Sequence, residues 1–257
     1  MVAHVGVLKQ MDRVWLLPHA SPSTIATHID RYIIREDAVV SDVSQEYALF
    51  IVGDGIVEHV ASQTEGLVSD GNASADHLTP VSANSLFEPS NLFAFACPLP
   101  IFGQRTLLLC CPAERAEQAI ETLSANGSEF CTAERFEWLR ISSFWPLHPS
   151  DIGDKTIPQE LDRDQQAISF TKGCYLGQET IARLTRGQLQ KKLCLIELSS
   201  TGEYVGDALT NGEKEVGHIT SRAIQPVPFP RTSHLRRGNF AAGTRLTGNG
   251  FEAHVLP

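Results

Sequence analysis

The sequence predicts an α+β fold in which a first domain of strand–strand–helix units is followed by a small C-terminal β-barrel. Two observations predict this fold. Short apolar segments alternate with amphipathic helical segments up to about residue 190, which is typical of ferredoxin-like units. From Lys191 onward, short alternating segments are divided by glycine and proline, which is typical of a small β-barrel or sandwich, and we expect the barrel. We therefore expect two domains, at residues 1–190 and 191–257.

The first element predicted is a strand pair. It is formed by "HVGVL" and "RVWLL", which a polar turn at residues 9–12 joins. Ser21 is the expected N-cap of a helix with Pro22 at its first position, where the missing N–H of proline costs nothing. Apolar residues share one face of this helix, namely Ile25, Ile29, Tyr32 and Ile33.

The next segments predict two strands, at residues 37–43 ("DAVVSDV") and 47–53 ("YALFIVG"). Asp54 is the expected cap of a short helix that follows. Residues 62–90 are rich in Ser, Asn, Asp and Gly and predict a long loop.

The strand pattern resumes with "NLFAFAC" and "RTLLLCC", and Pro112 begins a helix with an apolar face. Asn126-Gly127 predicts a turn, and "FEWLRISSF" predicts a further helix. In the C-terminal part, "KKLCLIELSS", "EVGHITSRA" and "GTRLT" predict strands. The proline-rich stretch at 225–233 predicts a loop or an edge strand.

Composition narrows the class of protein. The chain has 257 residues, of which 42% are hydrophobic and 20% are charged, as in ordinary globular proteins. Its net charge of −9 argues against a general nucleic-acid coat protein, and we expect no direct DNA binding. No stretch approaches the roughly 18 apolar residues that a membrane helix needs. We therefore expect a cytoplasmic protein without a membrane partner.

The six cysteines do not form a metal-binding pattern. None belongs to a C-x-x-C pair or lies at zinc-ligand spacing from a histidine, so we expect no metal site. Cys97, Cys110 and Cys111 end apolar runs and are expected to be buried free thiols. Only Cys174 lies in a segment that predicts chemistry.

That segment is "FTKGCYLGQETIAR", residues 170–183. Gly173 and Gly177 can take positive φ, so the backbone between them can turn sharply and approach a ligand. A helix is predicted from Gln178, and its positive N-terminus and Lys172 would favour a thiolate at Cys174. The alternative is a strand-to-helix turn with a buried small thiol.

Residues 172–192 carry five basic side chains against one acid, Glu179. A folate tail with its linked glutamates, or an RNA phosphate, would suit such a patch. An exposed helix flank with snorkelling basic side chains is the alternative.

The motif "KGCYLGQE", with "IPQE" at 157–160 and "ISF" at 168–170 before it, resembles the signature of the YgfZ-type folate-binding proteins. "RGQLQKKL" and "EVGHITS", at 215–221, resemble the basic stretch and a barrel strand that follow it in that family. YgfZ-type proteins are relatives of the glycine-cleavage T-protein, GcvT, an aminomethyltransferase. They are implicated in iron–sulfur cluster assembly and repair.

The resemblance implies a GcvT-type folate-binding domain that holds tetrahydrofolate in a central channel bordered by the Lys-Gly-Cys turn. It implies Cys174 as the chemically active group, exchanging sulfur or shielding a cluster or folate adduct, with Lys172 orienting an anionic partner. Tyr175, Gln178, Glu179 and Arg183 are the implied cofactor-binding residues. Packing for Tyr175, and a role in the first helical turn for Gln178 and Glu179, are their structural alternatives.

The resemblance also implies that this chain starts after the opening segment of the family, which carries part of the folate pocket and the catalytic aspartate of the transferases. We therefore expect an N-terminally shortened member of the family.

The expected function is that of a folate-dependent accessory protein in iron–sulfur cluster assembly or repair. Iron–sulfur assembly proteins or client enzymes would be its partners. The alternatives are a glycine-cleavage-type aminomethyltransferase, a factor linked to tRNA modification, and a scaffold that keeps the fold without the pocket. The transferases lack the cysteine in the corresponding turn, and this counts against the first alternative.

Overall fold

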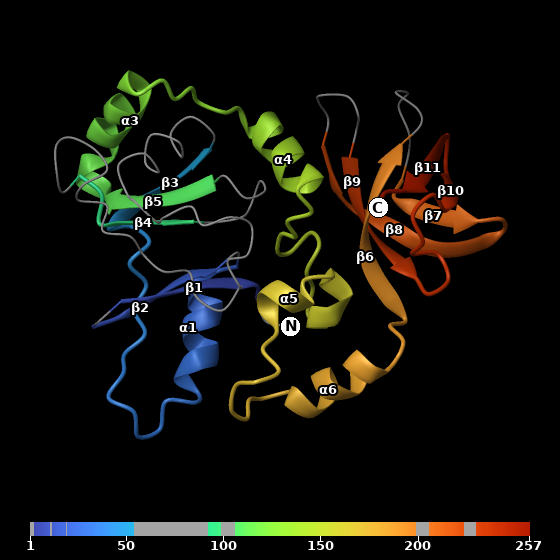
Figure 1. The fold of residues 1–257 in the computed structure, drawn as a ribbon, viewed down its shortest axis with the longest axis horizontal. Coiled ribbons are helices and arrows are strands. Elements are labelled where there is room, and N and C mark those ends of the chain that lie inside the picture. The colour runs from blue at the N-terminus through green and yellow to red at the C-terminus, as the bar shows by residue number, and fades with distance from the viewer. Residues whose placement is uncertain are drawn as a thin grey trace. The chain divides into compact units, whose positions relative to one another are not determined.

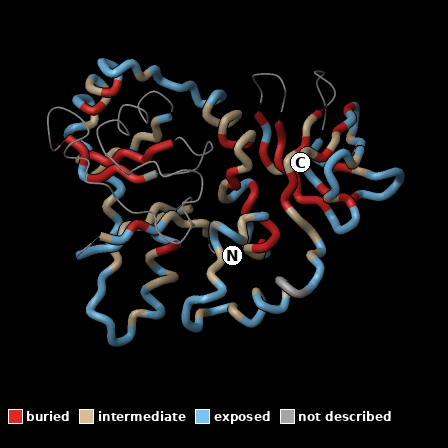
Figure 2. The backbone as a smooth tube through the Cα atoms, viewed as in Figure 1, coloured by how far each residue is buried: buried red, intermediate tan, exposed pale blue. Residues whose placement is uncertain are grey.

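The chain divides between residues 130 and 131 into two units, and each is described by itself. The structure is a computed structural model, and it describes residues 3–10, 12–18, 20–53, 92–98, 106–198, 206–223 and 230–257. Figure 1 shows the elements and Figure 2 their burial. The expected Asp54-capped helix and the loop at 62–90 lie outside the described residues.

The unit of residues 2–130 begins with the predicted strand pair. β1 (Val5–Lys9) and β2 (Val14–Pro18) are antiparallel, with Val7 opposite Leu16. The helix α1 (Pro22–Asp30) follows with Ser21 as its N-cap and Pro22 in its first turn, as predicted. It ends before Tyr32 and Ile33, so these two residues do not belong to its apolar face.

A three-stranded antiparallel sheet holds the core of this unit. Its strands lie in the order β3-β5-β4, with bounds β3 Tyr47–Gly53, β4 Phe95–Pro98 and β5 Thr106–Pro112. The 3₁₀ turn η2 (Ala113–Arg115) leads into α3 (Ala116–Ala125). Ala119 and Leu123 of α3 pack on Leu107 and Leu109 of β5 in one buried cluster. The strand predicted at 37–43 does not form, and Val39 there is 90% exposed.

The unit of residues 131–257 begins with α4 (Ala133–Ser142), whose N-cap Thr132 accepts a hydrogen bond from the backbone N–H of Arg135. Three short helical segments follow, and they are listed here with their bounds: η3 Pro158–Leu161, α5 Asp164–Ala167 and α6 Gln178–Arg186. In Figure 2 the stretch around α6 is mostly exposed, whereas the strands that follow it are largely buried.

Six antiparallel strands close into a barrel in the order β10-β11-β6-β9-β8-β7. Their bounds are β6 Lys191–Leu198, β7 Ala208–Asn211, β8 Lys214–Arg222, β9 Pro230–Arg236, β10 Arg245–Gly248 and β11 Phe251–Val255. Alternate side chains fill the interior, among them Ile196, Leu235 and Leu246. Gly217 of β8 is required because a Cβ there would overlap the carbonyl of His234 on β9.

The predicted α+β class with a C-terminal barrel is confirmed, although one part of the barrel was predicted wrongly. Residues 230–233 form part of β9, which pairs with both β6 and β8, and are neither loop nor edge strand. Proline is tolerated there because Pro230 is the first residue of the strand. The domain boundary expected near residue 190 stays a prediction.

Candidate functional site

The signature turn is an exposed loop that precedes α6. Its backbone is fixed at two points, by the N–H of Lys172, which donates to Ser169 Oγ at 3.3 Å, and by Gly177. Gly177 has φ +88 and is the N-cap of α6, so a side chain would be strained there. The expectation of positive φ holds for Gly177 only, because Gly173 is not among the positive-φ glycines.

Cys174 is one of two exposed cysteines, and Cys131 is the other. The four remaining cysteines are free and buried: Cys97, Cys110, Cys111 and Cys194. Burial raises the pKa of Cys97 and Cys194 to about 11, and it is also the main reason that the pKa of Cys110 is raised to about 12. The reading of Cys174 as a buried small thiol is therefore wrong, and its sulfur is open to reagents and partners.

Lys172 and Tyr175 interact with each other across the turn. The Nζ atom of Lys172 lies 4.4 Å from the centroid of the Tyr175 ring, within the range of a cation–π contact. This contact brings a cation and an aromatic face together on either side of Cys174. It also means that the ring face carries a bound cation in the structure described.

The first turns of α6 bring the other predicted site residues into line. The N–H of Gln178 donates to the carbonyl of Tyr175 at 3.2 Å. Glu179 accepts from Arg183 one turn later at 2.9 Å, and both side chains are exposed. This is the spacing at which a helix pairs opposite charges. The six predicted site residues thus belong to one exposed segment, and their roles stay predictions.

The basic stretch is largely neutralised by acids. Besides the Glu179–Arg183 pair, Lys191 lies 3.2 Å from the buried carboxylate of Glu160. Lys192 lies 2.8 Å from Asp162. Three of its five basic side chains therefore have a carboxylate partner, and the role of the stretch in binding an anion stays a prediction.

The 3₁₀ turn η3 supports α6 from a buried position. Gln159 is only 3% exposed, and its Nε2 donates to the carbonyl of Ile181 at 2.9 Å. Together with the two lysine pairs, this bond ties both α6 and the start of β6 to residues 159–162. Gln159 belongs to the motif "IPQE", which marks this position in the sequence. The motif alone does not show that the Gln159 side chain supports α6.

A polar network around Asp151 lies inside this unit, and sequence reasoning missed it. Asp151 Oδ1 accepts from the hydroxyls of Thr220, Ser221 and Thr232 at 2.5, 2.8 and 2.6 Å. Its Oδ2 lies 3.1 Å from Nη1 of Arg140, and both side chains are almost fully buried. The network fastens the segment after α4 to β8 and β9. Nothing in the sequence pattern pairs residues so far apart.

His234 on β9 extends the same network. Its Nε2 lies 2.8 Å from the backbone carbonyl of Asp151, which makes this nitrogen the protonated one of a neutral ring. Burial lowers the pKa of His234, which favours that neutral form.

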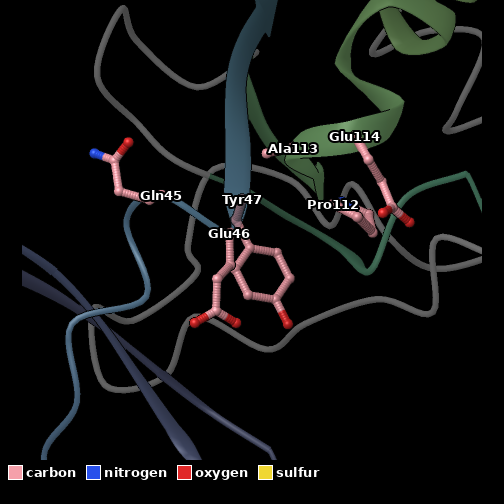
Figure 3. Close-up of a pocket in the computed structure, with 6 residues that line it drawn as sticks. All are labelled: Gln45, Glu46, Tyr47, Pro112, Ala113 and Glu114. Carbon is pink, nitrogen blue, oxygen red and sulfur yellow. The ribbon is translucent and has the colours of Figure 1, made fainter.

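A surface hollow of about 450 Å³ lies in the other unit, between the start of β3 and the end of β5 (Figure 3). Its lining residues are Gln45, Glu46, Tyr47, Pro112, Ala113 and Glu114. In Figure 3 the carboxylate of Glu46 and the ring of Tyr47 point to the same side. Two carboxylates and no cation line this hollow, so it does not suit an anionic ligand.

The described residues contain neither a metal-binding cluster nor a membrane-spanning helix. No group of three histidine, cysteine, aspartate or glutamate side chains there could hold a metal ion. No helix in that part of the chain is long and apolar enough to cross a bilayer.

Comparison with known proteins shows which proteins this chain resembles. The fold matches the aminomethyltransferase T of the glycine cleavage system from Bartonella henselae with a TM-score of 0.71. The match covers 100% of this chain and 71% of that one at 14% identity, so it establishes the fold alone. A tRNA-modifying protein YgfZ from Edwardsiella ictaluri is 39% identical over 97 residues. The chain therefore resembles the YgfZ proteins in sequence and shares its fold with an aminomethyltransferase T.

The other comparisons agree with this resemblance. A chloroplastic protein of Arabidopsis thaliana that is named as a transferase is 36% identical over 224 residues, which is 86% of this chain and 49% of the relative. The Edwardsiella match covers 37% of this chain and 27% of its relative. The chain thus spans about half or less of the length of these two curated relatives. No protein-family model matches the sequence.

Proposed function

We propose that this chain is a folate-dependent accessory protein of iron–sulfur cluster assembly or repair in which Cys174 is the reactive group. The observation that carries the proposal is the exposure of Cys174 on the turn that precedes α6. Thiolates are the usual protein ligands of iron–sulfur clusters and the usual acceptors of sulfur, and both roles need an accessible sulfur.

The residues of the turn fit tetrahydrofolate by their chemistry. Tyr175 offers an aromatic face, and Glu179 and Gln178 offer hydrogen-bonding groups for a pterin. Lys172 and Arg183 offer cations for the glutamate carboxylates. Bound tetrahydrofolate would supply a carrier for one-carbon units. Because Lys172 contacts the Tyr175 ring and Arg183 contacts Glu179, binding would exchange these contacts for contacts with the ligand.

The surroundings of Cys174 support a protein partner. Phe170 and Leu176 lie on either side of it in sequence and are 56% and 76% exposed. Exposed apolar side chains next to a reactive group are a common feature of protein-docking loops. An iron–sulfur assembly protein or a client enzyme is the partner that this proposal requires.

The name of the Edwardsiella relative favours one second candidate, a factor linked to tRNA modification. The fold shared with an aminomethyltransferase favours another, transfer of an aminomethyl group. A cysteine in the signature turn favours the accessory role over aminomethyl transfer, because the transferases lack a cysteine in the corresponding turn. The cytoplasmic location expected from the sequence also belongs to this proposal, and one relative is named chloroplastic.

Two independent measurements test the proposal. Calorimetric titration of the full chain with tetrahydrofolate should give saturable binding that Lys172→Ala and Arg183→Ala weaken and Cys174→Ala leaves in place. In cells that lack the endogenous gene, Cys174→Ala should fail to restore the activity of [4Fe–4S] enzymes, whereas Cys131→Ala, which removes the other exposed thiol, should restore it.

The results separate the candidates. Full restoration by Cys174→Ala would remove the reactive-cysteine role, and a lack of folate binding would remove folate dependence. Turnover in a glycine-cleavage assay with the lipoyl carrier would favour the aminomethyltransferase. Altered tRNA modification with unchanged [4Fe–4S] enzymes would favour the tRNA-linked factor.

A further inference from the structure

Arg163, just ahead of α5, is a half-buried cation without an acid. Its guanidinium carbon lies 4.4 Å from the centroid of the Trp145 ring, and its Nε is buried without a hydrogen-bond partner. Burial lowers the pKa of Arg163, and no carboxylate acts on that pKa in the opposite direction. Among the residues that the structure describes, none forms an ion pair with it.

This arrangement leaves the hydrogen-bonding capacity of the guanidinium unused. An arginine stays charged at any pH that the protein meets, so its burial costs free energy that a partner must offset. The Trp145 ring offsets part of that cost through the flat face of the guanidinium. The N–H donors lie in the plane of the group, however, and stacking engages none of them.

Two other cations of this unit show what Arg163 lacks. Buried Arg140 has Asp151, and Lys192 has Asp162. Asp164 follows Arg163 directly, yet the charged groups that act on Asp164 are Asp162 and Lys192. Asp164 therefore does not neutralise the charge of Arg163, although the two residues are neighbours in the chain.

The platform under Arg163 is fixed by the protein. Trp145 is 5% exposed, and its backbone carbonyl accepts a hydrogen bond of 2.7 Å from Arg140. Arg140 is in turn held by the Asp151 network. A guanidinium stacked on so rigid a ring is preorganised, which reduces the entropy that binding a ligand would cost.

We propose that Arg163, stacked on Trp145, is a binding site for an oxyanion, the carboxylate or phosphate group of a small ligand. Both groups match the planar fork of arginine donors, which can bind either of them through two parallel hydrogen bonds. The site needs neither Cys174 nor folate binding, so it stands independently of the proposed function.

Nuclear magnetic resonance of the arginine side chains tests this site in the full chain. The Nε–Hε resonances of ¹⁵N-labelled protein are followed while sodium phosphate, sodium acetate or sodium chloride is added at constant ionic strength. Arg163→Lys, which keeps the charge and loses the fork, identifies the resonance of Arg163. Arg135 is the matched control, because its guanidinium carbon lies 4.5 Å from the Trp138 ring centroid on an exposed part of α4.

The Arg163 resonance is expected to shift saturably with phosphate or acetate and not with chloride, while the Arg135 resonance follows ionic conditions only. In Arg163→Lys, where the Arg163 resonance is missing, binding is followed in both chains by the indole N–H resonance of the neighbouring Trp145. The substitution should weaken binding of the effective anion by about tenfold or more, as loss of a two-point contact predicts. The anion that saturates at the lower concentration identifies the ligand group as phosphate or carboxylate.

Three results would overturn the proposal. They are the absence of a saturable shift with both anions, an equal shift at Arg135, and unchanged binding in Arg163→Lys. The first two are read in the wild-type chain, so they hold even if a variant fails to fold.

Discussion

The side-chain amide of Gln159 donates a hydrogen bond of 2.9 Å to the backbone carbonyl of Ile181, in the middle of α6. It joins a buried turn to the exposed helix that follows the signature motif. A nine-residue helix is marginal without tertiary contacts, so this bond and the lysine pairs of Glu160 and Asp162 keep α6 in place.

Replacing Gln159 with Leu should therefore loosen α6 specifically. The side-chain volume is kept and the hydrogen bond is lost, so we expect a loss of about 1 kcal/mol in the free energy of unfolding. Amide hydrogen exchange of residues 178–186 should speed up more than exchange in the barrel. Gln165→Leu, on an exposed position of α5, is the control and should change neither quantity. Unchanged exchange in α6 would show that the bond does not hold the helix.

Replacing Asp151 with Ala should destabilise the chain strongly, because it removes the fully buried carboxylate beside Arg140, which then keeps only the partly exposed Glu137 as an acid. Breaking one side of a buried ion pair costs about 3–5 kcal/mol. Urea denaturation measures the loss. Glu179→Ala breaks an exposed pair in α6 and should cost about 0.5 kcal/mol or less. Similar losses in the two variants would contradict the importance of the Asp151 network.

Thiol titration of the native chain with a disulfide reagent at pH 8 should report two fast cysteines out of six. Cys131 and Cys174 are exposed, whereas the pKa of Cys110 is raised to about 12 and that of Cys97 to about 11, so these buried thiols stay protonated as well as covered. Cys174→Ser should leave one fast thiol, and denaturant should reveal all that remain. A third fast thiol in the native wild type would be inconsistent with this structure.

Stability should fall below neutral pH partly through His234. Burial holds the pKa of His234 below its ordinary value of 6.5, so the unfolded chain takes up the proton first as the pH falls. The contribution of His234 is thus fully present above pH 6.5 and is lost as the pH falls from there through the lower native pKa. The charges of Lys191, Glu160 and His218 also act on the pKa of His234.

Urea midpoints at pH 7.5 and 5.5 measure this effect. The decrease between the two pH values should be smaller in His234→Gln than in the wild type. His254→Gln, which alters an exposed histidine beside Glu197 on β6, is the comparison variant. A decrease of equal size in wild type and His234→Gln would mean that other groups govern the pH dependence.

The sequence predicted the elements whose signals are local. The strand pair at the N-terminus, α1, β3, β5, α3 and α6 follow from apolar spacing and from caps such as Ser21 and Gly177. The prediction of a strand at 37–43 was wrong, because apolar residues such as Val39 form a strand only where a neighbouring strand pairs with them. The prediction of a loop or edge strand at residues 230–233 was wrong, because pairing with two neighbouring strands of the barrel overrides the composition of this segment.

The candidate site was predictable only where the residues are close in sequence. Cys174 and Lys172 stand out within one motif, and the exposure of Cys174 agrees with its expected role. The Asp151 network bonds residues that lie up to 83 positions apart, and such pairs leave no trace in one sequence. The lack of an acid at Arg163 is likewise visible only once the neighbours of each charge are known.

Closure of the six-stranded barrel has a consequence for how partners can bind. Each of its strands has a neighbour on both sides, so its backbone offers no template on which a foreign strand could be added. In the three-stranded sheet, by contrast, β3 and β4 each pair on one side only among the described residues. A partner that docks by β-augmentation would therefore be directed to residues 47–53 or 95–98, and recognition of the barrel would depend on side chains and loops.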